Sequence, residues 1–375
     1  MIPGKLFCQR LTERKYVGAV ILGLLLVSVA PEWTEAQSAG QPAAVPSDQK
    51  IRDLERRIQK LEAKMDQTSK ALGRRGHGPD TLFTTVRASR PLDPTVRLLR
   101  MDTNIGNIQL TRGDGAEIMV EAIVRLDKRW VELEKTSKEF DEHVRMAQTG
   151  DVLTIADAHK DAPDHEAWAV SLKVAIPRAL PITALAGIGD VTVEIASGAV
   201  WLSTGVGNLT LNADTVESVT GSAGSGNATL HLGTVTGNVE AKAGAGSLTL
   251  QADSVASVIG EAGSGNATLH LGTVTGKVEA KAGAGNVALK LRQPGSQPDV
   301  HLTSGAGNLV LDLPPGSSGK FDLESGMGSI SVEGLQGVQV KKKGMGASAS
   351  AQVGEEGPHY KLRASVGSIT ISVRK

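Results

Sequence analysis

The sequence predicts an all-β protein, a parallel β-solenoid with one inserted α-helix and a coiled-coil helix near the N-terminus. Three observations predict this fold. A G-x-G motif recurs about every 20 residues, an alternating aliphatic strand follows each motif, and aromatic residues make up only 3% of the chain. A fixed period of this length marks a stacked repeat architecture. A core with so few rings must be built from small, regular aliphatic layers.

Residues 1–36 have the pattern of a signal peptide. Four basic residues precede an apolar run from Tyr16 to Ala30, which is short for a membrane span but suits a signal core. The small residues around Ala36 favour cleavage before Gln37, and an uncleaved signal anchor is the alternative. We expect a bacterial protein that is periplasmic, on the outer surface or secreted, with no stable transmembrane span after cleavage. Cys8 is the only cysteine, so the mature chain has no thiol chemistry.

The charge balance and the cysteine content exclude several classes of function. The chain has 40 basic and 40 acidic residues, whereas nucleic-acid binding usually requires a basic patch or stripe. Nucleic acid is therefore not expected as a partner. No pattern of nucleophile, base and orienting group is recognisable, and the G-x-G glycines open strands rather than the helix of a dinucleotide site. We expect no enzymatic activity and no cofactor.

Residues 48–72, between a small and polar linker at 37–47 and a second linker at 73–94, carry a heptad pattern. Isoleucine at the first core position and leucine at the second favour parallel two-stranded coiled coils. The seam residues are Ile51, Leu54, Ile58, Leu61 and Met65. We expect a homo-oligomer, a dimer or a trimer, held by residues 48–72. A single solvated amphipathic helix is the alternative, because three heptads are marginal without packing.

Residues 95–375 are expected to form the solenoid domain. Its first part has strand patterns at 96–99, 107–110, 118–126, 152–155 and 168–176, interrupted by a helical periodicity over 127–148. We expect the helical insertion to lie over one end or flank of the stack.

The regular repeats cover residues 187–334. Their first glycines fall at 187, 205, 224, 244, 263, 283, 305 and 326, and related motifs occur at 104–110, 344 and 365. Residues 223–246 and 262–285 are identical except that Asn238 is replaced by Lys277. A solenoid lengthens by duplicating coils, so this repetition has a structural explanation.

Alternation after each glycine pair predicts one buried and one wet face per strand. The predicted inward columns are aliphatic in all eight coils, for example Leu209 and Leu211 followed by Leu230 and Leu232. A second, alanine-rich strand in most coils lets the two sheets approach closely. The glycines would turn tight corners, and the Asn or Asp that follows them can bond the turn backbone or stack into a ladder.

The outward columns supply the candidate interaction face. A threonine column runs beside a mixed column, and the candidate residues are Thr210, Thr229, His231, Thr249, Thr268 and His270. Ice binding is an alternative use of such a ladder, and the simplest explanation is the ordinary preference of threonine for strands. Separately, the loop at 159–166 holds metal-capable side chains, but their close spacing is more typical of a solvated turn.

The stretch from Val170 to Leu211 resembles the core of bacterial adhesin-like domains of unknown function. Val174, Ile176 and Pro177 match the family's step from an aliphatic strand into a proline, and GIGDVTV and GVGNLTL match its short repeats. The resemblance covers about residues 95–373. It implies a β-solenoid of the cell envelope or a secreted one, and it supplies no catalytic residues.

These observations together predict a non-enzymatic, exported interaction module whose ligand is a glycan, the matrix or an envelope protein. A passive structural or stalk protein is the first alternative. A polysaccharide-binding or processing β-helix protein is the second, although the solenoid has few of the aromatic residues that sugar sites use.

Overall fold

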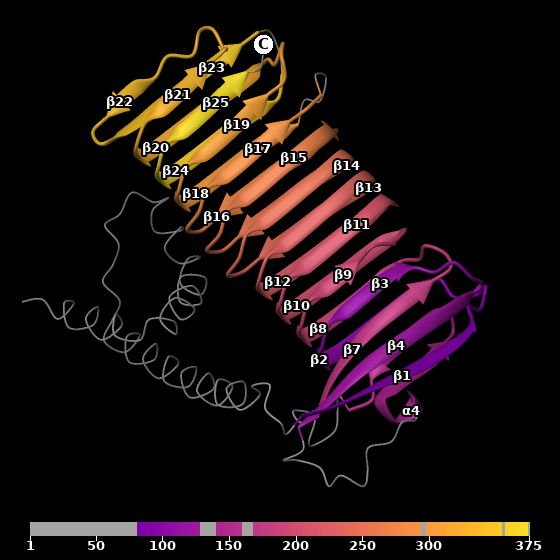
Figure 1. Cartoon of the computed structure of the whole chain (residues 1–375). Helices are drawn as coiled ribbons and strands as arrows, with labels where there is room; N and C mark the ends of the chain where they lie inside the picture. The colour runs from indigo at the N-terminus through magenta and orange to yellow at the C-terminus, as the bar shows by residue number, and fades with distance from the viewer. Residues whose placement is uncertain (1–80, 128–139, 160–167, 294–297, 355–356, 374–375) are drawn as a thin grey trace, which may run out of the picture.

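The computed structural model of the chain describes residues 81–127, 140–159, 168–293, 298–354 and 357–373. The predicted signal peptide, first linker and coiled coil lie outside the described residues. The described part is a long stack of strands in two layers, with β1 to β7 at one end and β20 to β25 at the other (Figure 1). The prediction of an all-β solenoid is confirmed.

The first layer, sheet 1, contains the strands that lead into the glycine corners, together with the strands that extend that layer at both ends. In spatial order these are β5 (Val144–Thr149), β6 (Val152–Asp157), β2 (Leu98–Ile105), β8 (Ile182–Ile188), β10 (Ala199–Val206), β12 (Ser218–Ser225), the last parts of β13 (Ala228–Ala243) and β14 (Leu248–Ala262), β16 (Lys277–Ala282), β18 (Asp299–Ala306), β24 (His359–Val366), β20 (Gly319–Met327), β23 (Gly346–Val353) and β22 (Lys341–Lys343).

The second layer, sheet 2, contains the strands that leave the corners, together with its own end strands. In spatial order these are β1 (Thr81–Pro91), β4 (Glu117–Asp127), β7 (Trp168–Ile176), β3 (Ile108–Arg112), β9 (Val191–Val193), β11 (Leu209–Val216), the first parts of β13 and β14, β15 (Ala267–Val274), β17 (Val287–Leu291), β19 (Leu309–Leu313), β25 (Ile369–Val373) and β21 (Ile330–Glu333). A short helix, α4 (Phe140–His143), precedes β5.

Large and small side chains alternate across the core between the two sheets. Sheet 2 contributes leucines such as Leu209 and Leu230, which are fully buried. They point at Gly221 in sheet 1, where an added Cβ would lie 3.6 Å and 3.8 Å from their Cδ2 atoms. Other coils place Ala241 or Ala280 at that position. The predicted alanine-rich face is therefore confirmed, and it lets the layers pack closely.

The corner glycines are required chiefly because stacked backbones approach one another closely. A Cβ on Gly207 would lie 2.2 Å from the carbonyl oxygen of Gly189, and one on Gly226 would lie 1.9 Å from that of Gly207. Gly226 also has a φ of 156°, which L side chains rarely adopt. The glycines form a ladder that no larger residue can enter without moving the backbone.

A second ladder runs beside the glycines and ties each corner to the next. Asp190 Oδ1 accepts a hydrogen bond from the backbone N–H of Asn208 at 2.7 Å, and Asn208 Oδ1 accepts one from that of Asn227 at 3.1 Å. The same bond recurs in successive coils as far as Ser368. The predicted Asn and Asp ladder is confirmed, and it satisfies corner N–H groups that strand pairing leaves unbonded.

The order of coils in space differs from their order in the chain at both ends. The last coil, β24 and β25, lies between the coil of β18 and β19 and the coil of β20 and β21. At the N-terminal end, β2 lies between β6 and β8, and β3 lies between β7 and β9. Each of these coils is held by two neighbours that are not its neighbours along the chain.

Antiparallel strands complete both ends of the stack. At the N-terminal end, β4 pairs with β7 and β1 pairs with β4, while β5 pairs with β6. At the C-terminal end, β23 pairs with β20 and β22 pairs with β23. The three residues of β22 are exposed lysines, and charged edges of this kind discourage pairing with another chain.

Three sequence predictions are wrong at these ends. The linker predicted at 73–94 contains β1, whose buried Val86 packs on the core. The helical insertion predicted at 127–148 is described only at its ends: Phe140–His143 is helical, but Val144–Thr149 is a strand, because pairing with β6 across the turn at Gly150 overrides local helical periodicity. The motif at 344 is the turn of the β22–β23 hairpin and not a coil corner.

Candidate functional site

The candidate residues from the sequence lie together on the outer side of sheet 2. They are Thr210, Thr229, Thr249 and Thr268 in one column and His231 and His270 in the next, and we name this set the threonine face. The parallel register of β11, β13, β14 and β15 produces both columns. Neighbouring strands lie about 4.8 Å apart, so the hydroxyl groups repeat at about that interval.

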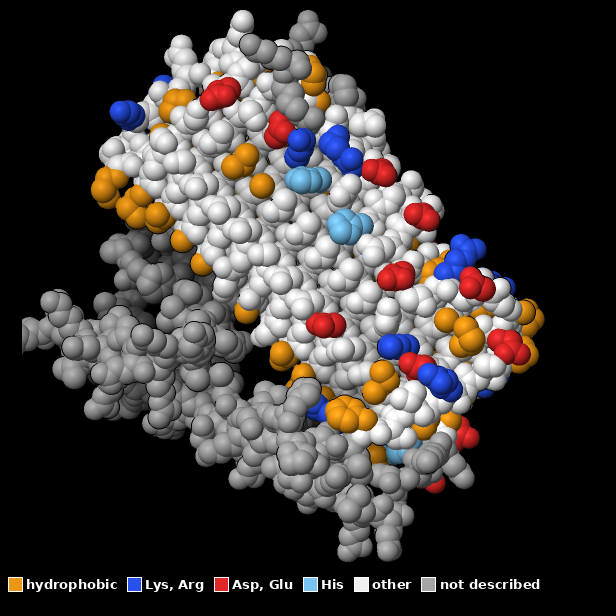
Figure 2. All heavy atoms as spheres, viewed as in Figure 1, with side chains coloured by type: hydrophobic (Ala, Val, Ile, Leu, Met, Phe, Trp, Pro, Cys, Tyr) orange, Lys and Arg blue, Asp and Glu red, His pale blue; other side chains and the backbone are white. Residues whose placement is uncertain are grey.

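The threonine face is polar and largely uncharged. Figure 2 shows this side of the stack, with mainly uncharged side chains over its middle. His231 Nδ1 lies 3.1 Å from Asn212 Oδ1 in the same column, and Lys290 Nζ lies 3.6 Å from Asp312 Oδ2 further along it. Hydroxyl groups both donate and accept hydrogen bonds. Such a surface can exchange hydrogen bonds with a polar ligand.

The threonine column ends within the sheet. Thr268 is followed by Ala288 and then by Val310, which is 38% exposed. In the other direction the column continues through Thr192 to Gln109. The regular hydroxyl array therefore covers the central coils of the stack.

The outer side of sheet 1 carries alternating charges. Glu279 lies 2.7 Å from Lys277 Nζ and 2.6 Å from Lys281 Nζ, and these bonds lower the pKa of its carboxyl to about 2. In the previous copy of the duplicated block, Lys242 lies 2.8 Å from Glu240. The charges are thus mutually satisfied, and exposed pairs of this kind contribute little to stability.

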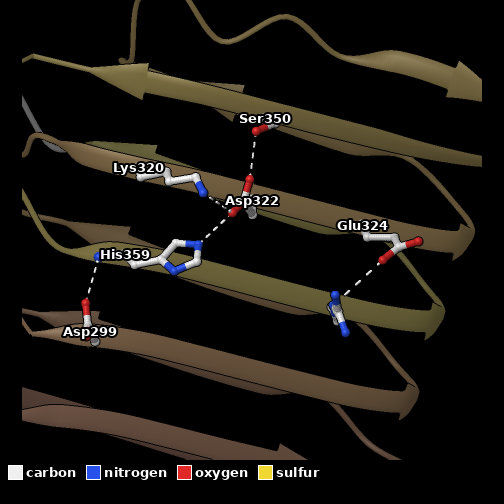
Figure 3. A network of polar contacts seen from close by, with 7 residues as sticks. Asp299, Lys320, Asp322, Glu324, Ser350 and His359 are labelled. Carbon is white, nitrogen blue, oxygen red and sulfur yellow. Dashed lines mark hydrogen bonds and ion pairs between the residues drawn. The ribbon is translucent and has the colours of Figure 1, made fainter. Parts of the chain in front are cut away.

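A polar cluster near the C-terminal end of sheet 1 brings three strands together (Figure 3). Ser350 Oγ on β23 donates to Asp322 Oδ1 on β20 at 2.7 Å, and His359 Nε2 on β24 lies 2.6 Å from Asp322 Oδ2. Lys320 Nζ lies 3.3 Å from the same oxygen. The hydrogen bond from Ser350 is the largest cause of the lowered pKa of Asp322, about 2, and the bonds from His359 and Lys320 add to it.

The order of this cluster does not suit nucleophilic catalysis. In a serine nucleophile site the imidazole bonds the hydroxyl and takes its proton, and the carboxylate orients the imidazole. Here Asp322 lies between Ser350 and His359. Since a carboxylate with a pKa near 2 is a weak base, Ser350 is not activated by it. The sequence analysis did not identify this cluster, because Ser350 and His359 lie 28 and 37 residues from Asp322 along the chain and meet it only by strand pairing.

A second polar cluster lies within the N-terminal end of the stack. The imidazole of His159 stacks on the indole of Trp168 with ring centroids 3.9 Å apart, and its Nε2 lies 3.2 Å from Nδ1 of the buried His143. Asp157 and Asp102 are also buried. Burial is the main reason that the pKa of Asp157 rises from 3.8 to about 6, and the charge of Asp102 adds to the rise.

The stability of the protein should fall as the pH rises through this titration. The folded state binds the proton of Asp157 more tightly than the unfolded state does. The free energy of unfolding therefore falls progressively as the pH rises from about 4 to about 6, and the loss is complete above about pH 6. The loss reaches up to about 3 kcal/mol, since one pKa unit corresponds to about 1.4 kcal/mol. Asp157→Asn should remove this fall from urea unfolding curves measured between pH 4 and pH 7. The exposed Asp214→Asn should retain it, and identical pH profiles for Asp157→Asn and the unmodified chain would contradict the prediction.

The described residues contain no metal site. Within them, no group of three or more His, Cys, Asp or Glu side chains could hold an ion. Of the metal-capable loop noted in the sequence, only His159 is described, and residues 160–167 lie outside the described part. The stacking of His159 on Trp168 agrees with a structural role for that side chain.

The comparison with protein families decides the membership of the chain. A model of the family described as Toastrack DUF4097 matches residues 102–372, from β2 to β25. The chain belongs to the Toastrack DUF4097 family. The resemblance to adhesin-like domains of unknown function is confirmed by this match.

Solved structures with similarity to this Toastrack chain include several named as candidate adhesins. One from Bacteroides fragilis is 12% identical, with 78% of this chain and 97% of that chain covered and a TM-score of 0.31. One from Parabacteroides merdae is 13% identical, with coverages of 60% and 95% and a TM-score of 0.33. A candidate cell adhesion protein from Clostridium sporogenes is 12% identical, with coverages of 78% and 100% and a TM-score of 0.22.

No curated protein matches the chain. In the described part of this Toastrack chain, no helix has both the length and the apolar character needed to cross a membrane.

Proposed function

We propose that the chain is an exported, non-enzymatic interaction module of the bacterial cell envelope, which attaches to a polar polymer through the threonine face. The observation that carries the proposal is the register of that face. Thr210, Thr229, Thr249 and Thr268 present equivalent hydroxyl groups in adjacent strands, which pair in parallel register above a core of fully buried leucines. A ligand with a repeating structure can contact several of them at once.

The chemistry of the two outer surfaces supports binding rather than catalysis. The carboxylates of sheet 1 with lowered pKa values, Glu279 and Asp322, are held by lysine, serine or histidine partners. A catalytic acid or base instead needs a pKa near the working pH and an open path to its substrate. Asp157 has a pKa near 6, but its side chain is buried in the N-terminal end of the stack.

Oligomerisation through residues 48–72 belongs to the same proposal. A contact made by a few hydroxyl groups is weak, because each hydrogen bond replaces one with water. Two or three linked copies raise the effective concentration of the face at a repetitive target, and the avidity can exceed the affinity of one copy by about a hundredfold or more. The coiled coil would therefore turn weak contacts into stable attachment.

The combination of Thr229→Lys, Thr249→Lys and Thr268→Lys should abolish attachment. Three ammonium groups on adjacent strands would repel one another and block close approach of a ligand to the hydroxyl column. We expect at least about a tenfold loss of bound protein, since a loss of about 1.4 kcal/mol corresponds to tenfold. Binding of residues 37–375 to bacterial cells and to a printed glycan array measures this.

The control places the same charge on the opposite sheet. Thr183 on β8, Ser203 on β10 and Ser222 on β12 point outward from sheet 1 in three neighbouring strands, and their replacement by lysine should leave attachment unchanged. Residues 81–375, which lack the predicted coiled coil, should be monomeric by light scattering, whereas residues 37–375 should be oligomeric. The shorter protein should also attach more weakly. Equal attachment by the two lysine variants would exclude the threonine face, and a monomer in both lengths would exclude the oligomer.

A further inference from the structure

A groove lies on the outer side of sheet 1 at its C-terminal end, on the opposite side of the stack from the threonine face. Its volume is about 630 Å³, within the range of small-ligand sites. Outward side chains of β20, β23 and β24 line its floor, and the segment that leads into β22, including Gly337 and Gln339, forms part of its wall. The cluster of Figure 3 lies in this floor.

The groove has more positive than negative charge. Lys341, Lys361 and Arg363 line it together with Asp322 and Glu324. Asp322 is already bonded by Ser350, His359 and Lys320, and Glu324 lies 3.7 Å from Arg363. In the part of the chain that the structure describes, no carboxylate lies within ion-pair distance of Lys341 or Lys361.

The strand register spaces these groups across the groove. Arg363, Glu324, Ser348 and Lys341 lie opposite one another in four neighbouring strands. With about 4.8 Å between neighbouring strands, the backbones of Arg363 and Lys341 are roughly 14 Å apart. Two cations thus flank a middle section that contains a hydroxyl and a carboxylate.

We propose that this groove binds an acidic oligosaccharide, a short chain of hydroxyl-bearing rings that carry carboxylate groups. The cations would pair with the ligand's carboxylates. Its hydroxyl groups would donate to Glu324 and Asp322 and exchange hydrogen bonds with Ser348, whereas an acidic peptide offers these carboxylates few hydroxyl donors. The proposal does not depend on attachment through the threonine face, because the groove lies on the other sheet.

In this groove, ion pairs and hydrogen bonds rather than ring stacking would bind the ligand. Phe321 on β20 and Tyr360 on β24 stack on each other inside the core with centroids 4.6 Å apart. They are therefore turned away from a ligand on the outer surface, and ring stacking is not provided by them. Binding should weaken as salt concentration rises, because exposed ion pairs are screened.

A tetramer of galacturonic acid tests the proposal by titration calorimetry with residues 37–375. We expect binding by the unmodified protein and at least a tenfold weaker affinity for the Lys341→Gln and Lys361→Gln double variant. Lys173→Gln and Lys290→Gln, which remove two cations from sheet 2, should leave the affinity unchanged. Circular dichroism of both variants should match that of the unmodified protein, since all four lysines project from the surface.

Three ligand controls separate the chemistry. The fully methyl-esterified tetramer should not bind, inorganic sulfate should not compete at equal concentration, and tetraglutamate should bind much more weakly. Binding of the neutral ester or equal binding of tetraglutamate would overturn the proposal, as would an unchanged affinity in the double variant. The threonine-face lysine variant should bind the tetramer with unchanged affinity. The two experiments therefore test the groove and the threonine face separately.

Discussion

Gly226→Ala is expected to destabilise the solenoid more than any conservative surface change. The new Cβ would lie 1.9 Å from the carbonyl oxygen of Gly207 and 2.6 Å from its carbon, so two stacked backbones would have to separate. The φ of 156° adds strain of its own. We expect the free energy of unfolding to fall by about 3 kcal/mol or more, measured by urea unfolding at neutral pH.

Ser225→Ala is the matched control for this prediction. Ser225 lies between the two corner glycines, and Ala245 and Ala284 occupy the same place in other coils. The control should therefore change stability by less than about 0.5 kcal/mol. Equal unfolding curves for the two variants would show that the corners accommodate a Cβ and that close backbone approach is not what requires the glycines.

Deletion of residues 359–375 should disrupt the preceding 40 residues as well. In a solenoid stacked in chain order, loss of the last coil leaves the others in place, since each coil contacts only its neighbours. Here β24 and β25 lie between two earlier coils. Their loss would detach β20, β21 and the β22–β23 hairpin from the stack. It would also expose the edges of β18 and β19, which favours aggregation.

Hydrogen exchange measured by mass spectrometry would show this effect region by region. Amides of residues 319–353 should lose their protection in the truncated protein, whereas those of β10 to β15 should keep theirs. A chain that ends at Val373 retains all of β25 and should behave like the full-length protein. Unchanged protection at 319–333 in the truncated protein would mean that the last coil does not hold that segment.

The regular part of the stack could be predicted because its information is local. The glycine pair, the alternating aliphatic strand and an Asn, Asp or Ser after the glycines recur in every regular unit, and a period of two assigns each residue to the core or to solvent. Leu209, Leu230 and Leu250 are buried as predicted, and Thr210, Thr229 and Thr249 lie outward in register. The threonine face could be predicted from the same period of two and the same repeat length.

The two polar clusters could not be predicted in this way. Asp322 meets Ser350 through an antiparallel pair and His359 through a parallel one, and His143 reaches His159 through the β5–β6 hairpin. The alternation of apolar and polar residues predicts which face of a strand a side chain occupies, but it does not predict which strand pairs with it. For charged and polar residues that do not recur with the repeat, the sequence therefore does not predict which of them will be in contact.

The sequence by itself determined the all-β class, the coil length, the inward columns, the corner glycines and the Asn ladder, because each depends on residues within one repeat and its copies. Only the tertiary structure decided the order of coils at the two ends, the antiparallel strands that complete them, and the groove built by β20, β23 and β24. The physical reason is that an exposed strand edge offers the same row of N–H and C=O groups to any partner. Which strand fills it depends on side-chain packing and chain connection across the whole fold.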